Sequence, residues 1–468
     1  MKENNIELEA NKNKIIETLR DYKIKIAKIE VTIGPTVTLY EVTPAPGVKF
    51  AQIKKLNDDK IALSLNTSGV RIYAPVQGVK KISIELPNQN PTIVPMSEVI
   101  ASKQFQESEL ALPVALGRTI ANEIYMFNLV NMPHLLIACA NEQEKSNGLN
   151  TIITSLLYKK HPSQLKFVMI DSEKMNLSIY SKIEKHFLAK LPSEKELISS
   201  ESSKSVSTMN SLCAEMDYRF KLLLDAQVQN IQEYNDKFIK SELNHENGHK
   251  YLPYIVVIID EFADFRMTAG EKVVCSIVPM AQRAHAVGIH LILATQRPAT
   301  NIITGIIKAN FPSRIAFKVA SKIESNVVLD APGAHQLIGN GDMLISINDD
   351  VTRVQCASID ANEIESVIEY ISTQQFYSEE YILQEYVPSN VTDLSNETNL
   401  NTRDELFEEV ARYIVSNQKG STSSIQRHFG LGYNRAGRIM EQLEKAGIVG
   451  KSNEDRPREV LIKDIKDL

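Results

Sequence analysis

The chain of 468 residues is long enough for about two to four globular domains, and its hydrophobic content of 43% can fill their cores. Its formal net charge of −6 excludes a uniformly basic nucleic-acid coat protein, so any contact with a polyanion would need a local basic patch. The four cysteines are widely spaced and form no CxxC pair, which is typical of reduced thiols and argues against a disulfide scaffold or a metal site.

The N-terminal region, residues 1–108, mixes a charged amphipathic segment, IIETLRDYKIKI, with short β-rich runs such as GPTVTLYEVTPAPGVKF and GVRIYAP. Proline and glycine turns separate these runs, so the pattern predicts a small α+β domain. The chain begins with the polar stretch MKENNIELEANKNK and contains no run of about 18 apolar residues. We therefore expect no membrane-spanning segment in this chain and a cytoplasmic location.

Residues 109–386 alternate apolar runs with helical patterns. The runs are HLLIACA, LKFVMID, YIVVIID, IHLILAT, RIAFKV and GDMLIS. Because these runs are apolar throughout, we expect strands that are covered on both faces and joined by helical crossovers in a mainly parallel sheet. The fold class predicted for this region is α/β.

The polar stretch VPSNVTDLSNETNLNT, residues 387–402, has too little apolar content to pack and predicts a linker. Residues 403–468 follow as a compact unit with three predicted helices, RDELFEEVARYIVSN, SSIQRHF and NRAGRIMEQLEKAG. The segment IVGKSNEDRPREVLI then predicts a two-stranded wing. This order of elements is typical of a winged helix-turn-helix domain, which binds DNA.

Functional side chains follow two of the predicted core strands. Lys145 and Ser146 open a helix after HLLIACA, where a phosphate loop carries its lysine and its magnesium-binding hydroxyl. Asp260 and Glu261 follow YIVVIID in a Walker B arrangement, in which the aspartate lies behind Mg²⁺ and the glutamate orients an attacking water. The structural alternatives are an ordinary charged first turn and acidic residues that cap the next helix.

A third strand, HLILAT, delivers Thr295, Gln296 and Arg297 to the place of a sensor for the γ-phosphate, unless these residues only start a loop before Pro298. The carboxyl ends of parallel strands meet at one edge of a sheet, where open α/β folds bind ligands. We therefore assign catalysis to Glu261 and Gln296, nucleotide binding to Lys145, Ser146, Asp260 and Thr295, and a bound magnesium ion to Ser146 and Asp260.

Several longer segments match one known pattern: LPVALGRTI, MPHLLIA, SLLYKKHP, PYIVVIIDEFAD, AVGIHLILATQRP, ITGIIKANFPSRIAF and GYNRAGRIMEQLEKAGIVG. Together they resemble the FtsK/SpoIIIE family of DNA translocases over almost the whole chain. The resemblance implies an α domain, a RecA-like P-loop NTPase motor domain that uses ATP and Mg²⁺, and a γ domain on a flexible tether. The family's membrane-spanning N-terminal region has no counterpart here, so we expect a motor-region chain without an anchor.

The resemblance also implies the partners. Family motors form a ring of six around double-stranded DNA, so we expect a homo-hexamer or a ring shared with an active paralog. The γ domain of the family reads short oriented chromosomal sequences and contacts a site-specific recombinase. The implied process is chromosome segregation in cell division.

The phosphate loop departs from the family pattern Gly-Thr-Thr-Gly-Ser-Gly-Lys-Ser. Its places are occupied by Cys139, Ala140, Asn141, Glu142, Gln143, Glu144, Lys145 and Ser146. A side chain in the left-handed region costs about 1 to 2 kcal/mol. Glu142 and Glu144 add negative charge where a triphosphate would lie, and a like-charge contact at about 4 Å costs about 4 kcal/mol at an effective dielectric of 20. The sum, on the order of 5 to 8 kcal/mol, approaches the whole of a micromolar affinity of about 8 kcal/mol, so we expect impaired ATP binding and hydrolysis.

Other departures affect charged positions of the family pattern. Asp171-Ser172-Glu173 replaces Asp-Pro-Lys, and Asn326 replaces an arginine that could stabilise transition-state charge across a subunit boundary. His285 and Asn340 stand where family members often carry arginine. Two alternatives stay open: an active ATP-driven translocase with an unusual phosphate loop, and a DNA-binding protein that is not a motor.

The last predicted helix has two faces. One is predicted to pack on the core through Ala436, Ile439, Met440 and Leu443, and the opposite stripe contains Asn434, Arg438, Glu441 and Lys445. Asn, Arg and Glu can bond adenine, guanine and cytosine in a major groove, although such a stripe is also typical of a solvated helix face.

The family resemblance assigns sequence reading to Asn434, Arg438 and Glu441. The candidates for contacts with DNA phosphates are Arg427, Arg435, Arg456 and Arg458.

Overall fold

The computed structural model has two compact units, Met1–Tyr386 and Val387–Leu468. The residues that the structure describes are 2–48, 53, 56, 58–67, 69–73, 81–171, 176–191, 198–199, 202–348, 350–375, 381–384, 386, 406–418, 421–429, 433–450 and 458–464. In these ranges no helix has the length and apolar character that a membrane crossing requires.

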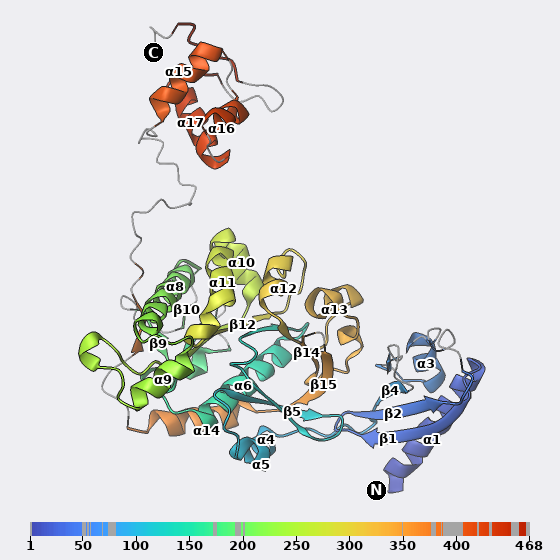
Figure 1. Ribbon diagram of the computed structural model, residues 1–468. Helices are drawn as coiled ribbons and strands as arrows, with labels where there is room; N and C mark the ends of the chain where they lie inside the picture. The colour runs from blue at the N-terminus through green and yellow to red at the C-terminus, as the bar shows by residue number, and fades with distance from the viewer. Residues whose placement is uncertain are drawn as a thin grey trace. The chain divides into compact units, whose positions relative to one another are not determined.

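The first unit begins with a four-stranded antiparallel sheet in the order β1-β2-β4-β3, with two helices packed beside it (Figure 1). The elements are α1 (Lys2–Asp21), β1 (Ile26–Ile33), β2 (Val37–Pro44), α3 (Asp58–Leu65), β3 (Arg71–Tyr73) and β4 (Ile82–Pro87). Apolar residues at alternating positions of β2 and β4 are buried against both helices. The helices and short strands predicted for this region are thus present.

The rest of the unit is built on a ten-stranded sheet in the order β10-β8-β11-β12-β7-β13-β14-β15-β5-β6. Its strands are β5 (Pro113–Thr119), β6 (Ile124–Asn128), β7 (His134–Ala138), β8 (Leu165–Ile170), β10 (Ile198–Ser199), β11 (Tyr254–Ile259), β12 (Ile289–Thr295), β13 (Ser313–Ala316), β14 (Asp342–Ile347) and β15 (Asp350–Cys356). All six predicted apolar runs therefore contain strands.

The expected mainly parallel pairing holds only for the half of this sheet from β10 to β13. From β13 to β6 each pair is antiparallel, and this includes β14, which the sequence pattern had placed among the crossover strands. For β14 and β15 the physical reason is the chain length available. Only two residues separate β14 from β15, and such a short connection can join antiparallel strands only.

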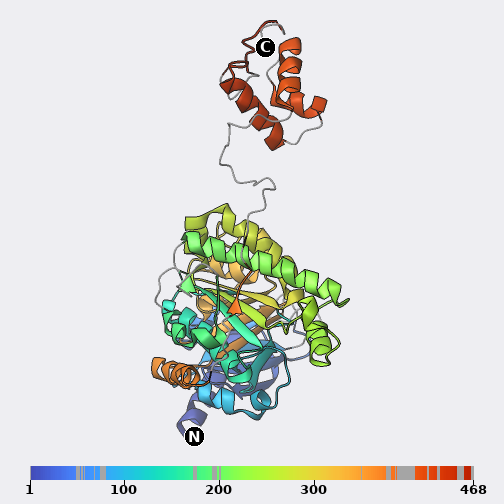
Figure 2. The same cartoon turned by 90° about the vertical axis from the view of Figure 1, so that its left-hand side faces the viewer.

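Helices cover both faces of the parallel half (Figures 1 and 2). α6 (Glu142–Lys159) and α14 (Ala361–Ser372) lie on one face, and α8 (Ser202–Asp225), α10 (Phe262–Ala269) and α11 (Glu271–Arg283) lie on the other. Every residue of β7, β8, β11 and β12 is buried between these layers, which explains their predominantly apolar sequences.

Shorter elements complete this unit. They are α4 (Met96–Ala101), α5 (Lys103–Gln106), η1 (Ser178–Ile183), α7 (Glu184–Phe187), β9 (Ala189–Lys190), α9 (Ile231–Ile239), η2 (His245–Asn247), η3 (Ala284–Val287), α12 (Gly305–Asn310), α13 (Lys322–Leu329), η4 (Ala334–Gln336) and β16 (Tyr381–Ile382). α6 packs closely because Gly148 has no side chain, since a Cβ at this position would lie 2.8 Å from the ring of Phe317.

The second unit contains α15 (Phe407–Asn417), α16 (Thr422–Phe429) and α17 (Tyr433–Lys445) around a small apolar core. The predicted core face of the last helix is confirmed, because its four apolar positions are at most 1% exposed, namely Ala436, Ile439, Met440 and Leu443. Val449 and Val460 form an antiparallel bridge where the wing was predicted. Residues 451–457 of that wing and the predicted linker 387–402 lie outside the described residues.

A buried ion network joins the two sheets of the first unit. Glu85 on β4 accepts hydrogen bonds from Arg71 at 3.2 Å and from Arg353 on β15 at 2.5 Å. Arg353 also donates to both carboxylate oxygens of Asp342, and all four side chains are at most 6% exposed. Burial opposes the charge on Arg353, but Asp342 and Glu85 outweigh it and raise its pKa.

Removing the shared carboxylate tests this network. We expect Glu85→Gln to lower the free energy of unfolding by about 3 to 5 kcal/mol, because it leaves two buried guanidinium groups without their common partner. Urea denaturation followed by circular dichroism measures the loss. The matched control is Glu41→Gln, whose carboxylate is 31% exposed and pairs with Lys81, and a loss below about 1 kcal/mol is expected there. Equal losses in the two variants would contradict a structural role for the network.

Candidate functional site

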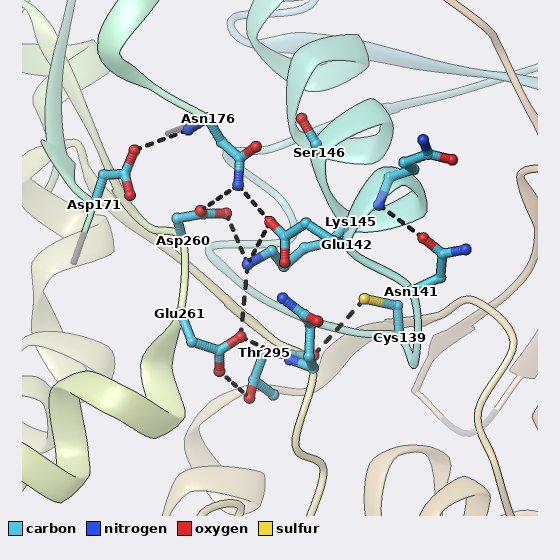
Figure 3. Close-up of polar contacts among 12 residues, drawn as sticks. Cys139, Asn141, Glu142, Lys145, Ser146, Asp171, Asn176, Asp260, Glu261 and Thr295 are labelled. Atoms are coloured by element: carbon cyan, nitrogen blue, oxygen red, sulfur yellow. Dashed lines mark hydrogen bonds and ion pairs between the residues drawn. The ribbon is translucent and has the colours of Figure 1, made fainter. Parts of the chain in front are cut away.

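The carboxyl ends of three neighbouring strands, β7, β12 and β11, bring the predicted site residues together. Lys145 comes from the first turn of α6 after β7, Asp260 and Glu261 follow β11, and Thr295 ends β12. Figure 3 shows their side chains directed toward one another. The convergence expected from the sequence is therefore observed.

The start of α6 differs from a phosphate loop. The helix begins at Glu142, three residues before Lys145, and Asn141 caps it by accepting a hydrogen bond from the amide of Gln143 at 2.8 Å. The amides of Cys139 and Ala140 donate to the carbonyls of Thr295 and Lys318 on neighbouring segments. Several main-chain amides of this loop are thus bonded to the chain itself.

The strain expected from the missing glycines is absent. Residues 139–146 are all described, and none of them has a positive φ. The chain avoids left-handed turns because it enters the helix early, through an extended Asn141 with φ −121° and ψ 126°. Replacing the glycines therefore changes the path of the main chain and does not strain it. On this path the loop does not have the shape of an anion-binding loop.

Lys145 is the centre of the site. Its side chain is 2% exposed, and its ammonium lies 3.2 Å from Glu142, 3.3 Å from Asp260 and 3.5 Å from Glu261 (Figure 3). Burial opposes this charge, but the carboxylates of Asp260, Glu261 and Glu142 outweigh it and raise the pKa of Lys145. The lysine is a cation whose charge is already compensated within the chain.

Asp260 and Asn176 extend this cluster. The amide of Asn176 donates to Asp260 at 2.9 Å and also to Glu142. Burial raises the pKa of Asp260, although Lys145 and Asn176 act against that rise. Asp171 holds Asn176 in place by accepting from the main-chain amides of Asn176 and Leu177. Sequence reasoning missed Asn176, for which the only signal was its place in the connection after β8.

Glu261 is a buried hydrogen-bond acceptor in this structure. One oxygen accepts a hydrogen bond from the hydroxyl of Thr295 at 2.6 Å. The same oxygen accepts a hydrogen bond from the amide of Ala263, and Glu261 thereby caps α10. The other accepts from the amide of Gln296 at 2.9 Å. The helix-capping alternative considered for this carboxylate is therefore also real. Of the two proposed catalytic side chains, Glu261 is 4% exposed and Gln296 is half-buried.

Ser146 lies beside this cluster without joining it. Its hydroxyl accepts a hydrogen bond from Asn150 at 3.4 Å, and no dashed contact reaches it in Figure 3. In the part of the chain that the structure describes, no group of three or more His, Cys, Asp or Glu side chains could hold a metal ion. Glu142 is paired with Lys145, and several amides of the loop are bonded within the chain. Because of these contacts, the residues do not fit ATP and Mg²⁺ in the usual phosphate-loop manner.

Glu144 does not face the site, contrary to the expectation that it adds charge in phosphate space. Its carboxylate turns to the segment before β14, where the main-chain amides of Asn340 and Gly341 act to lower its pKa. The side chain is buried, and one of its oxygens has no hydrogen-bond partner. Burial raises the pKa of Glu144, and the two amides and Lys318 oppose that rise while Asp342 adds to it.

Two of the positions at which the family pattern carries arginine, His285 and Asn326, lie on the surface. His285 is exposed, and its ring is 6.3 Å from that of His134 at the amino end of β7, on the sheet edge opposite Lys145. Asn326 is exposed on α13.

Among the DNA-binding candidates, Arg458 has described side-chain contacts. Arg458 pairs with Glu444 of α17 and donates to the carbonyl of Met440 at 3.4 Å. Arg438 and Glu441 are in α17, but their side chains lie outside the described residues, as do those of Asn434, Arg427 and Arg435 and the whole of Arg456.

Three family models match the chain in succession: the FtsK alpha domain at residues 1–88, the FtsK/SpoIIIE family at 95–300 and the FtsK gamma domain at 401–463. A DNA translocase FtsK of Chlorobaculum tepidum is 44% identical over 97% of this chain and 56% of its own length. A DNA translocase SpoIIIE of Bacillus subtilis is 41% identical, with the same coverage of both chains. The chain thus spans a little over half the length of these relatives.

Among solved structures, the pCW3 conjugation coupling protein TcpA, in its monomer form with ATPγS, has a similar fold. The TM-score is 0.51 at 22% identity, and the alignment covers 76% of this chain and 97% of that one. At this identity the likeness concerns the fold alone.

The buried carboxyl of Glu144 predicts a pH dependence. Because its pKa is raised in the folded chain, the protonated form stabilises the fold fully below about pH 4.5, and this stabilisation is lost as pH rises through the folded value. Glu144→Gln cannot lose a proton, so we expect its melting temperature relative to the wild type to increase between about pH 4 and pH 8. Thermal melts across that range measure the difference. The exposed Glu123→Gln is the control, and a Glu144→Gln difference that does not change with pH would contradict the prediction.

Proposed function

Because this chain belongs to the FtsK/SpoIIIE family, we propose that it acts on double-stranded DNA during chromosome segregation and cell division. The support is the succession of alpha, motor and gamma family matches and the name DNA translocase carried by relatives of about 40% identity. We propose that the first unit binds DNA as a ring-forming, RecA-like motor domain. The ring is a homo-hexamer or includes an active paralog.

Support for a RecA-like motor comes from the sheet. β7, which precedes the phosphate-loop position, lies between β12 and β13 in the parallel half. The Walker B strand β11 is the next strand beyond β12. This topology brings Lys145 and Asp260 to the same edge of the sheet, 3.3 Å from each other, which is the edge where a phosphate loop and a Walker B strand meet.

We propose further that ATP binding and turnover are impaired in this chain. The observation that carries this proposal is the neutralised Lys145, whose ammonium meets Glu142, Asp260 and Glu261 within 3.5 Å. An incoming triphosphate would have to displace Glu142 and gain few main-chain amides in return. The protein would then work as a DNA-binding ring subunit without hydrolysis.

An active translocase with an unusual phosphate loop is the second candidate. It is favoured by the close approach of Lys145, Asp260, Glu261 and Thr295, all of which persist from the family pattern. The second unit is common to both candidates. In both, α17 is the DNA-reading helix and the unit contacts a site-specific recombinase.

ATP turnover separates the two candidates. We expect the purified chain to shift duplex DNA in a gel equally well with and without ATP and Mg²⁺, and to release no phosphate above background when duplex is added. The comparison variant is Glu142→Gly/Gln143→Ser/Glu144→Gly, which restores the family residues at these places and should gain turnover. Duplex-stimulated hydrolysis by the wild type that Lys145→Ala abolishes would establish the active translocase.

DNA reading by α17 is tested with two arginines of different assigned roles. Arg438→Ala should relax the preference for a G-containing site by about 1 to 3 kcal/mol, because one bidentate base contact is lost. Arg456→Ala should weaken binding to all duplexes alike and reduce the salt dependence. Fluorescence anisotropy with matched and scrambled duplexes measures both. An equal loss of specificity in the two variants would refute the assignment.

A further inference from the structure

An anion of the chain itself already lies where Lys145 would meet a phosphate. One carboxylate oxygen of Glu142 is 3.2 Å from the ammonium of Lys145 and accepts a hydrogen bond from Asn176. Asn176 in turn donates to Asp260, which also faces Lys145 (Figure 3). The Glu142 carboxylate is therefore an anion bound to the lysine that reaches the phosphates in a phosphate loop.

The geometry of the helix favours this contact. Glu142 and Lys145 are three residues apart in the first turn of α6, so their side chains share one face of the helix. A carboxylate is also favoured at the amino end of a helix, because the macrodipole is positive there. The Asn141 cap fixes the turn from which both side chains extend.

The contact also gives Lys145 a counter-ion on its solvent side. The other two carboxylates at Lys145 have further partners, since Asp260 accepts from Asn176, and Glu261 accepts from Thr295 and Gln296. Glu142 is the most exposed of the three, with 38% of its side chain accessible, against 3% and 6% for the others. It is the member of the cluster that closes the site toward solvent.

We propose that Glu142 is a tethered substitute for a phosphate group, which keeps the motor unit in one occupied arrangement independently of nucleotide. This inference rests on the proposed function, since it names how the nucleotide site of a family motor is regulated. The bound carboxylate holds Lys145, Asn176 and Asp260 in place and excludes an external anion. A ring subunit of this kind does not change state when ATP is added.

Removing the carboxylate should open the site to a small anion. In Glu142→Ala, Lys145 loses a counter-ion on its solvent side, and the orthophosphate monoanion that dominates at about pH 6 restores the charge of the lost side chain. We expect the melting temperature of full-length Glu142→Ala to fall by about 3 °C or more. Sodium phosphate at about 50 mM should then raise it by at least about 2 °C more than it raises that of the wild type.

Three comparisons isolate the effect. Sodium chloride at matched ionic strength should not replace phosphate, Glu142→Ala/Lys145→Met should not respond beyond the wild type, and the exposed Gln143→Ala on the same turn should behave as the wild type. If Glu142→Ala does not fold by itself, its refolding in phosphate but not in chloride supports the proposal. Failure to refold in both overturns it.

Two further outcomes would overturn the proposal: a Glu142→Ala variant as stable as the wild type, or equal phosphate shifts in all variants. Duplex binding by the wild type is measured separately. A chain that fails to bind duplex would refute the proposed function whatever the phosphate result.

Discussion

The buried ammonium of Lys145 and the three carboxylates around it determine the character of this protein's candidate site. A lone ammonium that is 2% exposed would be too costly to keep in a folded chain, so its counter-ions are a requirement of the fold. Asp260 and Glu261, which directly follow β11, supply two of them. Glu142 supplies the third, and with all four groups ionised the cluster is negative before any ligand arrives.

The same turn of α6 also links the site to the rest of the first unit. Glu144 lies beside the main chain at Asn340 and Gly341, immediately before Asp342 begins β14. Asp342 belongs to the buried network that continues through Arg353 to Glu85 on the N-terminal sheet. The carboxylates of Glu142 and Glu144 distinguish this loop from the family pattern. They contact different parts of the fold and do not face each other.

The altered loop is compatible with membership of the FtsK/SpoIIIE family, because it still connects β7 to α6. The segment from Cys139 to Glu144 lies between β7 and Lys145 and uses some of its amides and the first turn of α6 for internal contacts. The fold thus keeps Lys145 at the sheet edge while Glu142 occupies its solvent side. This supports a DNA-binding role that does not depend on turnover.

Much of this protein followed from its sequence alone. Uniformly apolar runs identified the buried strands, the acidic and polar residues after them predicted one shared sheet edge, and the spacing of Ala436, Ile439, Met440 and Leu443 predicted the core face of α17. These are local properties of side-chain periodicity, which a sequence displays directly. The tertiary structure decided the remaining features, because they depend on which distant groups come into contact. They are the hydrogen bond from Asn176 to Asp260, the position of Glu144 beside the segment before β14, and the antiparallel half of the sheet. Above all, the sequence showed Glu142 as a charge that would repel phosphate, and only the folded chain could turn that charge onto Lys145.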